Sequence, residues 1–343
     1  MGKFDGVLLA SDFDNTILNT EIPRRTGCPI PPISRRNTDA LRYFMANGGR
    51  FAVATGRALP AFRLFADQVP MNAPAVVCNG GALYDFQTET YLDTMELPEE
   101  IRVQGQAVLD RFPTAAVEAY HLNNVIHAVR PNLYTRQHEH VTHAGVEPVS
   151  ALTDVPVPLV KIMFEDDHEH LTALRDYVLQ QAWSENYEIF FSDRTLLEVT
   201  RKGASKGAMV ARLAQRLGIS PAHIYCAGDE NNDLSMLTMA AEGFAPANCV
   251  ETVRNCGATI VADCDHDTLE EIIDVMVERL RDQHILRLKD GICSIDTGVV
   301  FLDVLNNAER ISDHCSNIAV RMVGMEAGED YDSHTLKSIM HHN

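Results

Sequence analysis

The sequence has no apolar run long enough to cross a bilayer as a helix, and none of its 8 cysteines forms a CxxC pair. Basic residues are scarce, because 29 Lys and Arg stand against 48 Asp and Glu, a formal net charge of -19. This balance argues against nucleic acid or an anionic membrane surface as the main partner. The N-terminus also lacks the basic and apolar stretches of a secretory signal. Scattered cysteines are typical of reduced thiols, so we expect a cytoplasmic protein with no membrane span.

The 343 residues are enough for two or three domains. Near the N-terminus, short apolar runs predict buried strands, and amphipathic segments between them predict helices. The predicted strands are "GVLLAS", "RFAVATGR" and "PAVVCNGG", and the predicted helices are "NTDALRYFMA" and "LPAFRLFADQV". Such an alternation indicates a doubly wound parallel sheet with helices on both faces, which is an α/β fold.

The pattern changes over residues 84–193, where alternating strands and a few helices indicate an α+β unit. The α/β pattern returns with "GASKGAMVARLAQRLGI". We therefore expect a discontinuous core of residues 1–83 and 194–265, with residues 84–193 inserted as a second domain. Residues 266–343 have helical apolar spacing with a break at Lys289-Asp290-Gly291, which suggests a helical hairpin.

Two carboxylates follow the first predicted strand. Asp12 and Asp14 are two residues apart, so they point to the same side of an extended chain while Phe13 turns away. That spot lies at the carboxyl edge of the sheet, where folds of this class bind ligands. Two adjacent carboxylates repel each other unless a divalent cation or a division into nucleophile and acid resolves the conflict. A simple capping pair is the alternative for this motif taken alone.

Three further segments place polar side chains at strand ends or helix starts. They are "ATGR" with Thr55, Gly56 and Arg57, "ASKGA" with Lys206, and "CAGDENNDLSML" with Asp229, Asn232 and Asp233. The first supplies a hydroxyl and backbone N–H groups suited to an anion. A solvated lysine and an acidic turn are the alternatives for the other two segments. An acid pair, Thr, Lys and a second acid pair in this order favour one phosphate-handling site.

The order and residues of these motifs resemble the haloacid dehalogenase (HAD) superfamily, specifically its Cof-type, class IIB sugar-phosphatase-like hydrolases. The resemblance covers residues 5–265 through DFDNT, ATGR, SKG and GDENND. It implies a Rossmann-like core with a C2-type α+β cap, and only the gap between Thr55 and Lys206 is long enough for that cap. "CNGG" stands where the family usually has NGA. Asn15 replaces the usual Gly, but Asn tolerates left-handed backbone, so we expect the turn to persist.

The resemblance also implies roles for the site residues. Asp12 would be the nucleophile that forms an aspartyl-phosphate, and Asp14 would be the general acid and base. Mg²⁺ would be held by Asp12, the backbone carbonyl of Asp14, and Asp229, with Asp233 in the same acid set. Thr55 and Lys206 would hold phosphate oxygens. The other residues expected to bind phosphate or substrate are Thr16, Gly56, Arg57, Asn79, Gly80 and Asn232.

The predicted cap carries several histidines: His121, His127, His138, His140 and His143. No tight ligand set is visible among them, so we expect them to be solvated or locally hydrogen-bonded. In class IIB enzymes the cap covers the leaving group, and the class implies a small phosphorylated metabolite, such as a sugar phosphate, as substrate. A phosphomutase is a further alternative, but the cap shows no recognisable set for a phosphorylated sugar.

The C-terminal segment is similar to the PhoU-like helical domain through "HILRL", "GIC" and "LDVLNNAERISDHCSNIA". Glu309 and Asp313 are four residues apart, so they share a helix face, with His314 and Asn317 nearby. They reproduce the acid-xxx-acid motif of metal-binding members, although solvated acids are the alternative. Only about half of the usual tandem bundle is present, which favours self-association or a protein partner. This segment keeps open a second function, a phosphate-responsive regulatory protein with little turnover.

Overall fold

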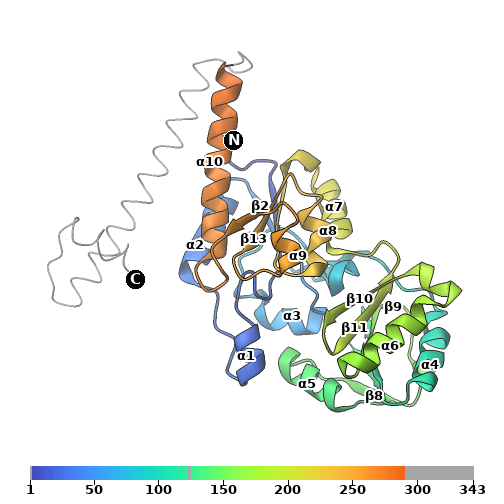
Figure 1. Ribbon diagram of the computed structural model, residues 1–343. Coiled ribbons are helices and arrows are strands. Elements are labelled where there is room, and N and C mark those ends of the chain that lie inside the picture. The colour runs from blue at the N-terminus through green and yellow to red at the C-terminus, as the bar shows by residue number, and fades with distance from the viewer. Residues whose placement is uncertain (1, 123–124, 290–343) are drawn as a thin grey trace, which may run out of the picture. The chain divides into compact units, whose positions relative to one another are not determined.

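The computed structural model describes residues 2–122 and 125–289. The chain divides into two compact units, Met1–Ile273 and Asp274–Asn343. The first unit holds three β-sheets and most of the helices (Figure 1). Glu309, Asp313, His314 and Asn317 of the PhoU-like segment lie outside the described residues.

A five-stranded parallel sheet, the core sheet, forms the centre of the first unit. Its strands are β1 (Leu8–Ser11), β2 (Arg50–Val53), β12 (Ile224–Ala227), β13 (Glu242–Pro246) and β14 (Thr259–Val261). Their order is β14-β13-β12-β1-β2, so β1 lies between β2 and β12 and the direction of winding reverses there. In open α/β sheets ligands bind outside the carboxyl ends of the strands at such a reversal.

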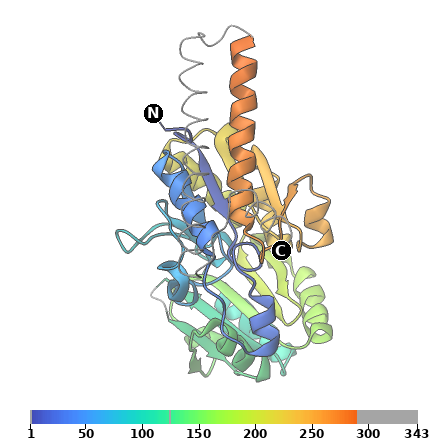
Figure 2. The ribbon, with the colours of Figure 1, turned by 90° about the vertical axis from the view of Figure 1, so that its left-hand side faces the viewer.

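Helices cover both faces of the core sheet, as expected for a doubly wound fold (Figures 1 and 2). These helices are α2 (Arg35–Ala46), α3 (Leu59–Ala66), α7 (Lys206–Leu217), α8 (Leu234–Leu237) and α9 (Glu251–Arg254). Leu8 and Ala10 of β1 share a buried cluster with Met209 and Leu213 of α7. The alternate residue Leu9 points to the opposite face, because side chains alternate along a strand.

A small antiparallel sheet follows the second core strand. It contains β3 (Ala75–Val77), β4 (Ala82–Asp85) and β5 (Thr90–Thr94). The segment "PAVVCNGG" was expected to be a third strand of the parallel sheet, and this is corrected by the pairing. Its β3 pairs along its length with β4, and only a single parallel bridge joins Val76 to Ala54 at the core sheet.

A six-stranded sheet, the cap sheet, is formed by the middle of the chain. Its strands are β6 (Ala116–His121), β7 (Ile126–Val129), β8 (Glu147–Val149), β9 (Leu159–Glu165), β10 (Tyr187–Asp193) and β11 (Leu196–Arg201). Their order is β10-β11-β9-β6-β7-β8. The helices of this region are α4 (Ile101–Arg111), α5 (Leu133–Thr142) and α6 (His168–Leu179).

Strand pairing shifts both expected limits of the inserted region. β4 and β5 continue the small sheet begun by β3, so the chain after residue 83 still belongs with the core. β11 pairs with β9 and β10, so the chain after residue 193 is still in the cap sheet. Both shifts arise because a hairpin keeps its second strand beside its first.

The remaining regular elements are short, apart from the last helix. They are α1 (Glu21–Thr26) and the 3₁₀ helices at Cys78–Gly80, Leu152–Asp154, Ala182–Asn186, Pro221–His223 and Asn231–Asp233. α10 (Thr268–Lys289) is the first helix predicted for the C-terminal segment. The N–H groups of its second and third residues, Leu269 and Glu270, donate to the buried side chain of Asn37 at 3.0 and 3.1 Å. This side chain caps α10 from α2 and so ties the two helices together.

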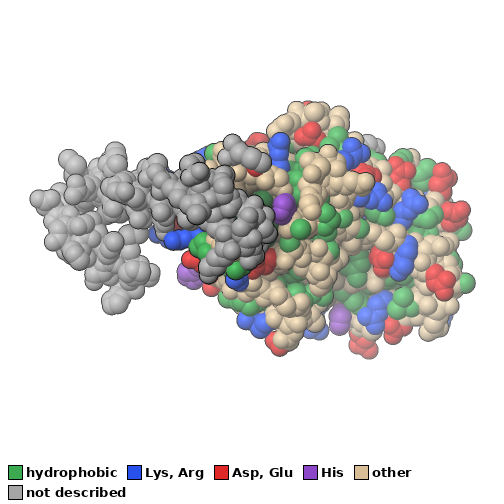
Figure 3. Space-filling view, turned by 90° about the horizontal axis from the view of Figure 1, so that it is seen from above, with side chains coloured by type: hydrophobic (Ala, Val, Ile, Leu, Met, Phe, Trp, Pro, Cys, Tyr) green, Lys and Arg blue, Asp and Glu red, His purple; other side chains and the backbone are tan. Residues whose placement is uncertain are grey.

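Charged side chains of both signs are interspersed on the face shown in Figure 3, and no single-sign patch dominates it. Within the described ranges, no helix combines the length and the apolar character needed to cross a membrane.

Candidate active site

The strand ends at the reversal of the core sheet bring three carboxylates together. β1 leads into Asp12, whose backbone N–H donates to the carbonyl of Ala227 at the end of β12 (2.8 Å). Asp229 lies two residues after the end of β12, and Asp233 is the N-cap of α8. The three side chains are buried, and one carboxylate oxygen of each lies within 4.8 Å of the others. The two acid motifs of the sequence therefore form one site.

Lys206 is the one described lysine that contacts this cluster. It is the first residue of α7, whose N-cap Ser205 accepts from the N–H of Ala208. Its Nζ donates to Oδ1 of Asp12 at 2.6 Å and to Oδ1 of Asp233 at 2.7 Å. The side chain is only 1% exposed, so these bonds are shielded from solvent. The alternative of a solvated lysine is thus excluded.

The charges of this cluster do not balance, because three carboxylates face one ammonium group. Burial, together with Asp233 and Asp14, raises the pKa of Asp12 to about 7 despite the opposing Lys206. Burial and the charge of Asp12 raise the pKa of Asp229 well above its usual value. A cation among these oxygens would neutralise the excess negative charge, so the donor set fits a divalent metal ion.

Asp229 and Asp233 differ in how many of their carboxylate oxygens already accept hydrogen bonds. Both oxygens of Asp233 are engaged, since Oδ2 accepts from the N–H groups of Asp229 and Glu230 at 3.0 Å and Oδ1 accepts from Lys206. Oδ1 of Asp229 accepts from the hydroxyl of Thr16 at 3.0 Å. Among the residues that the structure describes, no hydrogen bond engages Oδ2 of Asp229. Asp229 is therefore open to a metal ion, whereas Asp233 positions the loop and Lys206.

Asp14 is held by a side chain that the sequence assigned to phosphate. Nε and Nη2 of Arg57 donate to its carboxylate at 2.9 and 2.7 Å, which is a bidentate pair. The guanidinium also lies over the rings of Phe13 and Phe65. Although burial opposes the effect, Arg57 holds the pKa of Asp14 below its usual value. Arg57 thus orients Asp14 here, and Phe13 turns into the core as expected.

The loop after β2 presents Thr55 and Gly56 at the same edge. Thr55 is buried, and its hydroxyl oxygen accepts from the N–H of Arg57 at 3.1 Å. Gly80 has a φ of 90°, and a Cβ there would lie 2.1 Å from the carbonyl oxygen of Ser205. Gly80 therefore permits the close approach of α7, and its expected contact with substrate stays a prediction.

Asn79 and Asn232 bind each other and reach the cap sheet. Nδ2 of Asn232 donates to Oδ1 of Asn79 at 2.9 Å, and Nδ2 of Asn79 donates to Oε2 of Glu198 on β11 at 2.9 Å. Asn79 adopts left-handed backbone with a φ of 54°. Both amides thus connect the core loops to the cap sheet at the mouth of the site.

Sequence reasoning missed the contribution of the cap strands. Nζ of Lys161 on β9 lies 3.2 Å from Oε2 of Glu198, 3.5 Å from the carbonyl oxygen of Gly56, and 4.4 Å from the ring centre of Tyr120. Lys161 and Glu198 are both buried. The available signal was Lys161 in the middle of a mostly apolar strand, because a buried charge must be paired.

A cavity of about 950 Å³ lies between these groups. Asp12, Asp14 and Lys206 line it from the core, and Lys161 and Glu198 line it from the cap. Its volume is that of a small-molecule site. The arrangement can bind an anion at Lys206 and present the carboxylate of Asp12 to it.

The family of the chain follows from comparison with known proteins. Residues 9–273 match the family model of haloacid dehalogenase-like hydrolases. The chain belongs to this family. Pyridoxal phosphate phosphatase YbhA of Escherichia coli (strain K12) is 22% identical over 280 residues, covering 78% of this chain and 97% of the relative. The hydrolase family and its phosphatase members identify the chain as a phosphoric monoester hydrolase.

Solved structures of HAD hydrolases confirm the predicted fold class. One from Bacteroides thetaiotaomicron superposes with a TM-score of 0.68 at 21% identity, covering 79% of this chain and 99% of its own. The HAD subclass IIB sugar phosphatase BT4131 superposes with a TM-score of 0.65 at 19% identity, covering 79% and 98%. Residues 265–322 match the model of the PhoU domain, so the second predicted resemblance is also confirmed.

Proposed function

We propose that this HAD hydrolase is a Mg²⁺-dependent phosphatase that cleaves small phosphomonoesters through an aspartyl-phosphate on Asp12. The observation that carries the proposal is the buried Asp12 carboxylate at the sheet reversal, held 2.6 Å from Nζ of Lys206. A buried carboxylate beside a fixed ammonium group can approach a phosphate dianion, which an exposed, unpaired carboxylate would repel.

The proposed reaction has two steps, formation and hydrolysis of the aspartyl-phosphate, and side chains of this protein transfer the proton in each. A carboxylate oxygen of Asp12 forms a bond to phosphorus as the bond to the leaving oxygen breaks, and Asp14 donates a proton to that oxygen. Asp14 then takes a proton from the water that attacks the aspartyl-phosphate, which releases phosphate and restores Asp12. Lys206, Thr55 and the N–H of Gly56 hold the phosphate oxygens. In the free site Arg57 favours the ionised form of Asp14. The negative charge of a bound phosphate dianion would raise the pKa of Asp14 and so favour the protonated form that acts as the acid.

Asp12, the backbone carbonyl of Asp14, and Asp229 would hold the Mg²⁺ ion, which supplies charge neutralisation when bound. Asp233 supports this set by orienting the N–H groups of the Asp229 loop. The unbalanced carboxylates of the site support the choice of a divalent cation.

A polar leaving group fits the cap side of the cavity. Lys161, Glu198 and Tyr120 offer it an ammonium, a carboxylate and a hydroxyl group. The similarity to a pyridoxal phosphate phosphatase and to the structure of a sugar phosphatase supports a sugar phosphate or similar phosphomonoester. The six described cysteines are all thiols, in keeping with a cytoplasmic setting.

Phosphate release from a panel of small phosphomonoesters, with Mg²⁺ and with EDTA, tests the proposal. We expect release by the wild-type chain in Mg²⁺, and a loss of at least a thousandfold with EDTA or in Asp12→Asn. Asp12→Asn should keep the wild-type circular dichroism spectrum, because Asn fills the same volume. Turnover in Asp12→Asn at the wild-type rate would disprove the assignment of the nucleophile.

The PhoU match favours a second candidate function, a phosphate-responsive regulatory protein with a slow HAD core. In this case the C-terminal helices would mediate self-association or bind a protein partner. No phosphate release from any compound, with the chain folded and Mg²⁺ bound, would favour this second function over the first.

A further inference from the structure

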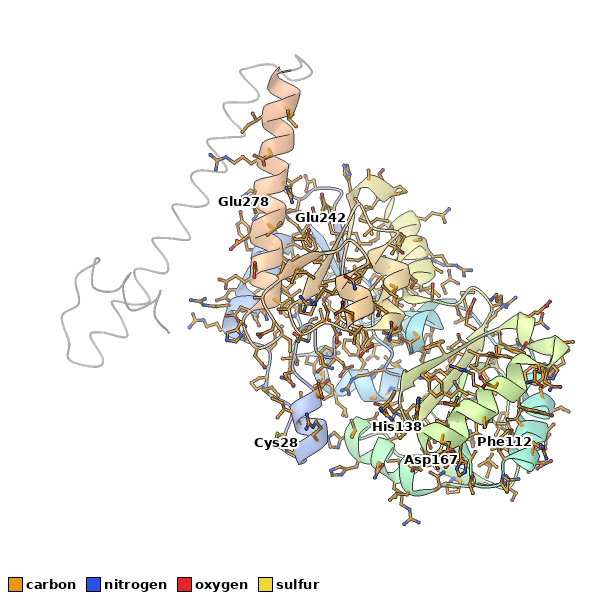
Figure 4. All side chains as sticks on the ribbon, viewed as in Figure 1. Cys28, Phe112, His138, Asp167, Glu242 and Glu278 are labelled. Carbon is orange, nitrogen blue, oxygen red and sulfur yellow. The ribbon has the colours of Figure 1, made fainter. Side chains whose placement is uncertain are left out.

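A second cluster of ionisable side chains lies in the cap, apart from the catalytic carboxylates. Glu118 on β6 and Glu165 on β9 belong to neighbouring antiparallel strands, with Glu118 paired to Met163 and Glu165 paired to Ala116. The two glutamates are therefore diagonal neighbours on one face of the cap sheet. Both side chains are fully buried. His138 of α5, labelled in Figure 4, completes the cluster.

The contacts within this cluster leave two oxygen atoms unused. Nδ1 of His138 lies 3.1 Å from Oε2 of Glu118 and 3.7 Å from Oε1 of Glu165. The hydroxyls of Tyr120 and Thr135 donate to Oε2 of Glu118 and Oε2 of Glu165, respectively. Across residues 2–122 and 125–289, Oε1 of Glu118 and Oε1 of Glu165 are buried without a hydrogen-bond partner. A buried, unsatisfied carboxylate oxygen is costly and calls for a ligand.

We propose that Glu118, His138 and Glu165 bind a divalent transition-metal ion in the cap, with Zn²⁺ as the best fit. One ligand atom from each of the three lies within 4.8 Å of the other two. In tetrahedral zinc sites neighbouring ligand atoms are about 3.3 Å apart, as follows from metal–ligand lengths of about 2.0 Å. The separations of 3.1 and 3.7 Å from Nδ1 of His138 bracket that value. A nitrogen ligand beside two carboxylates favours Zn²⁺ over Mg²⁺, which prefers oxygen ligands alone.

The other acidic group with a histidine in the cap lacks these features. Asp166, Asp167 and His170 also lie within metal-binding reach of one another, but His170 is exposed. Asp167 accepts from the N–H of His170 as the N-cap of α6, and Asp166 accepts from the hydroxyl of Thr114. These bonds explain that cluster without a metal ion.

The Glu118–His138–Glu165 site would order one wall of the catalytic cavity. His138 lines that cavity from α5, while both glutamates belong to the cap sheet. A metal ion shared by the three residues would fix α5 against the sheet. The metal-free alternative is the hydrogen bond between Nδ1 of His138 and Oε2 of Glu118, together with a proton held by Glu165, whose pKa is raised well above its usual value by burial and by Glu118. If that alternative holds, Zn²⁺ does not bind at this cluster.

Titration of the chelator-stripped, full-length chain with Zn²⁺ in excess Mg²⁺, followed by calorimetry, tests this proposal. Excess Mg²⁺ is added to occupy the catalytic carboxylates, a step that rests on the proposed function. We expect a Zn²⁺ site that is weakened at least tenfold in His138→Ala and unchanged in His140→Ala. His140 is the matched control because it is an exposed histidine on the same helix. No Zn²⁺ binding by the wild-type chain, or equal binding by the two variants, would overturn the proposal.

Two further measurements guard against misfolding and against binding at the catalytic site. Co²⁺ in place of Zn²⁺ should give the wild-type chain visible absorption bands that Glu165→Gln reduces, even if His138→Ala fails to fold. Asp229→Asn should retain the Zn²⁺ site, because Asp229 belongs to the catalytic cluster. Loss of the site in Asp229→Asn with full retention in His138→Ala would assign the ion to the catalytic cluster and refute the cap site.

Discussion

Asn15 shows how one side chain can do more than the glycine that the family usually has at its position. Its backbone is left-handed with a φ of 53°, as the sequence predicted. Its Oδ1 also accepts from the N–H groups of Thr20 and Glu21 at 3.1 and 3.0 Å, and its carbonyl accepts from Asn248 at 2.7 Å. The asparagine therefore fixes the start of α1 as well as the turn that follows Asp12 and Asp14.

Substitution of Asn15 separates these two contributions. Asn15→Gly keeps the left-handed turn but loses two acceptor contacts, so we expect the free energy of unfolding to fall by about 1 kcal/mol. Asn15→Ala adds the strain of a Cβ in left-handed backbone, a further cost of about 1 kcal/mol. Urea unfolding of the three proteins measures both steps. Equal stability of the Gly and Ala variants would show that backbone strain does not contribute.

At the scale of elements, the hairpin of β6 and β7 pairs two histidines that the sequence left undefined. Nε2 of His121 lies 3.0 Å from Nδ1 of His127, and the rings meet edge to face. The expectation of locally bonded histidines is confirmed for this pair. Burial and the neighbouring His127 lower the pKa of His121, so its neutral form is favoured in the folded chain. The stability of this hairpin therefore depends on pH.

The sign of this dependence follows from proton binding. Below the ordinary histidine pKa of about 6.5, the unfolded chain takes up a proton at His121 more readily than the folded chain. The contribution of His121 to stability is therefore present above pH 6.5 and lost as the pH falls through the lowered folded value. We expect His121→Gln to lose less stability than the wild type between pH 7.5 and 5.5, by roughly 0.5 kcal/mol.

Thermal unfolding at several pH values measures this difference, with His140→Gln as the control. His140 is exposed on α5, so its variant should follow the wild-type curve. Parallel stability curves for His121→Gln and the wild type would contradict the expected role of the pair.

At the scale of the whole molecule, the two family matches share residues 265–273. The first compact unit extends to Ile273, and the side chains of Leu269, Ile272 and Ile273 are buried in it. The beginning of α10 is thus part of the hydrolase core. The sequence placed the end of the core at residue 265, before this buried turn.

Two truncations test where the hydrolase core ends. A chain that ends at Asp265 loses four buried apolar side chains, those of Leu269, Ile272, Ile273 and Met276, so we expect its free energy of unfolding to fall by about 6 kcal/mol. A chain that ends at Lys289 retains them and should match full-length turnover. Urea unfolding and phosphate release measure these effects, and light scattering of the longer form reports any change in self-association. Equal stability of the two truncated chains would place the end of the core before α10.

Local patterns in the sequence determined the parallel core, the inserted cap and the acid pair after β1. Strand periodicity alone places Asp12 and Asp14 on one side and Phe13 on the other, and strand order places Asp229 beside them. Only the tertiary structure decided the partners of the charged groups. Arg57 holds Asp14, Thr16 supports Asp229, and both oxygens of Asp233 are engaged.

The placement of β11 in the cap sheet and the contacts of Lys161 and Glu118 also depend on the tertiary structure. The physical reason is the range of each effect. Side-chain alternation is a property of a few consecutive residues, whereas the partner of a buried charge is set by which distant strand packs against it.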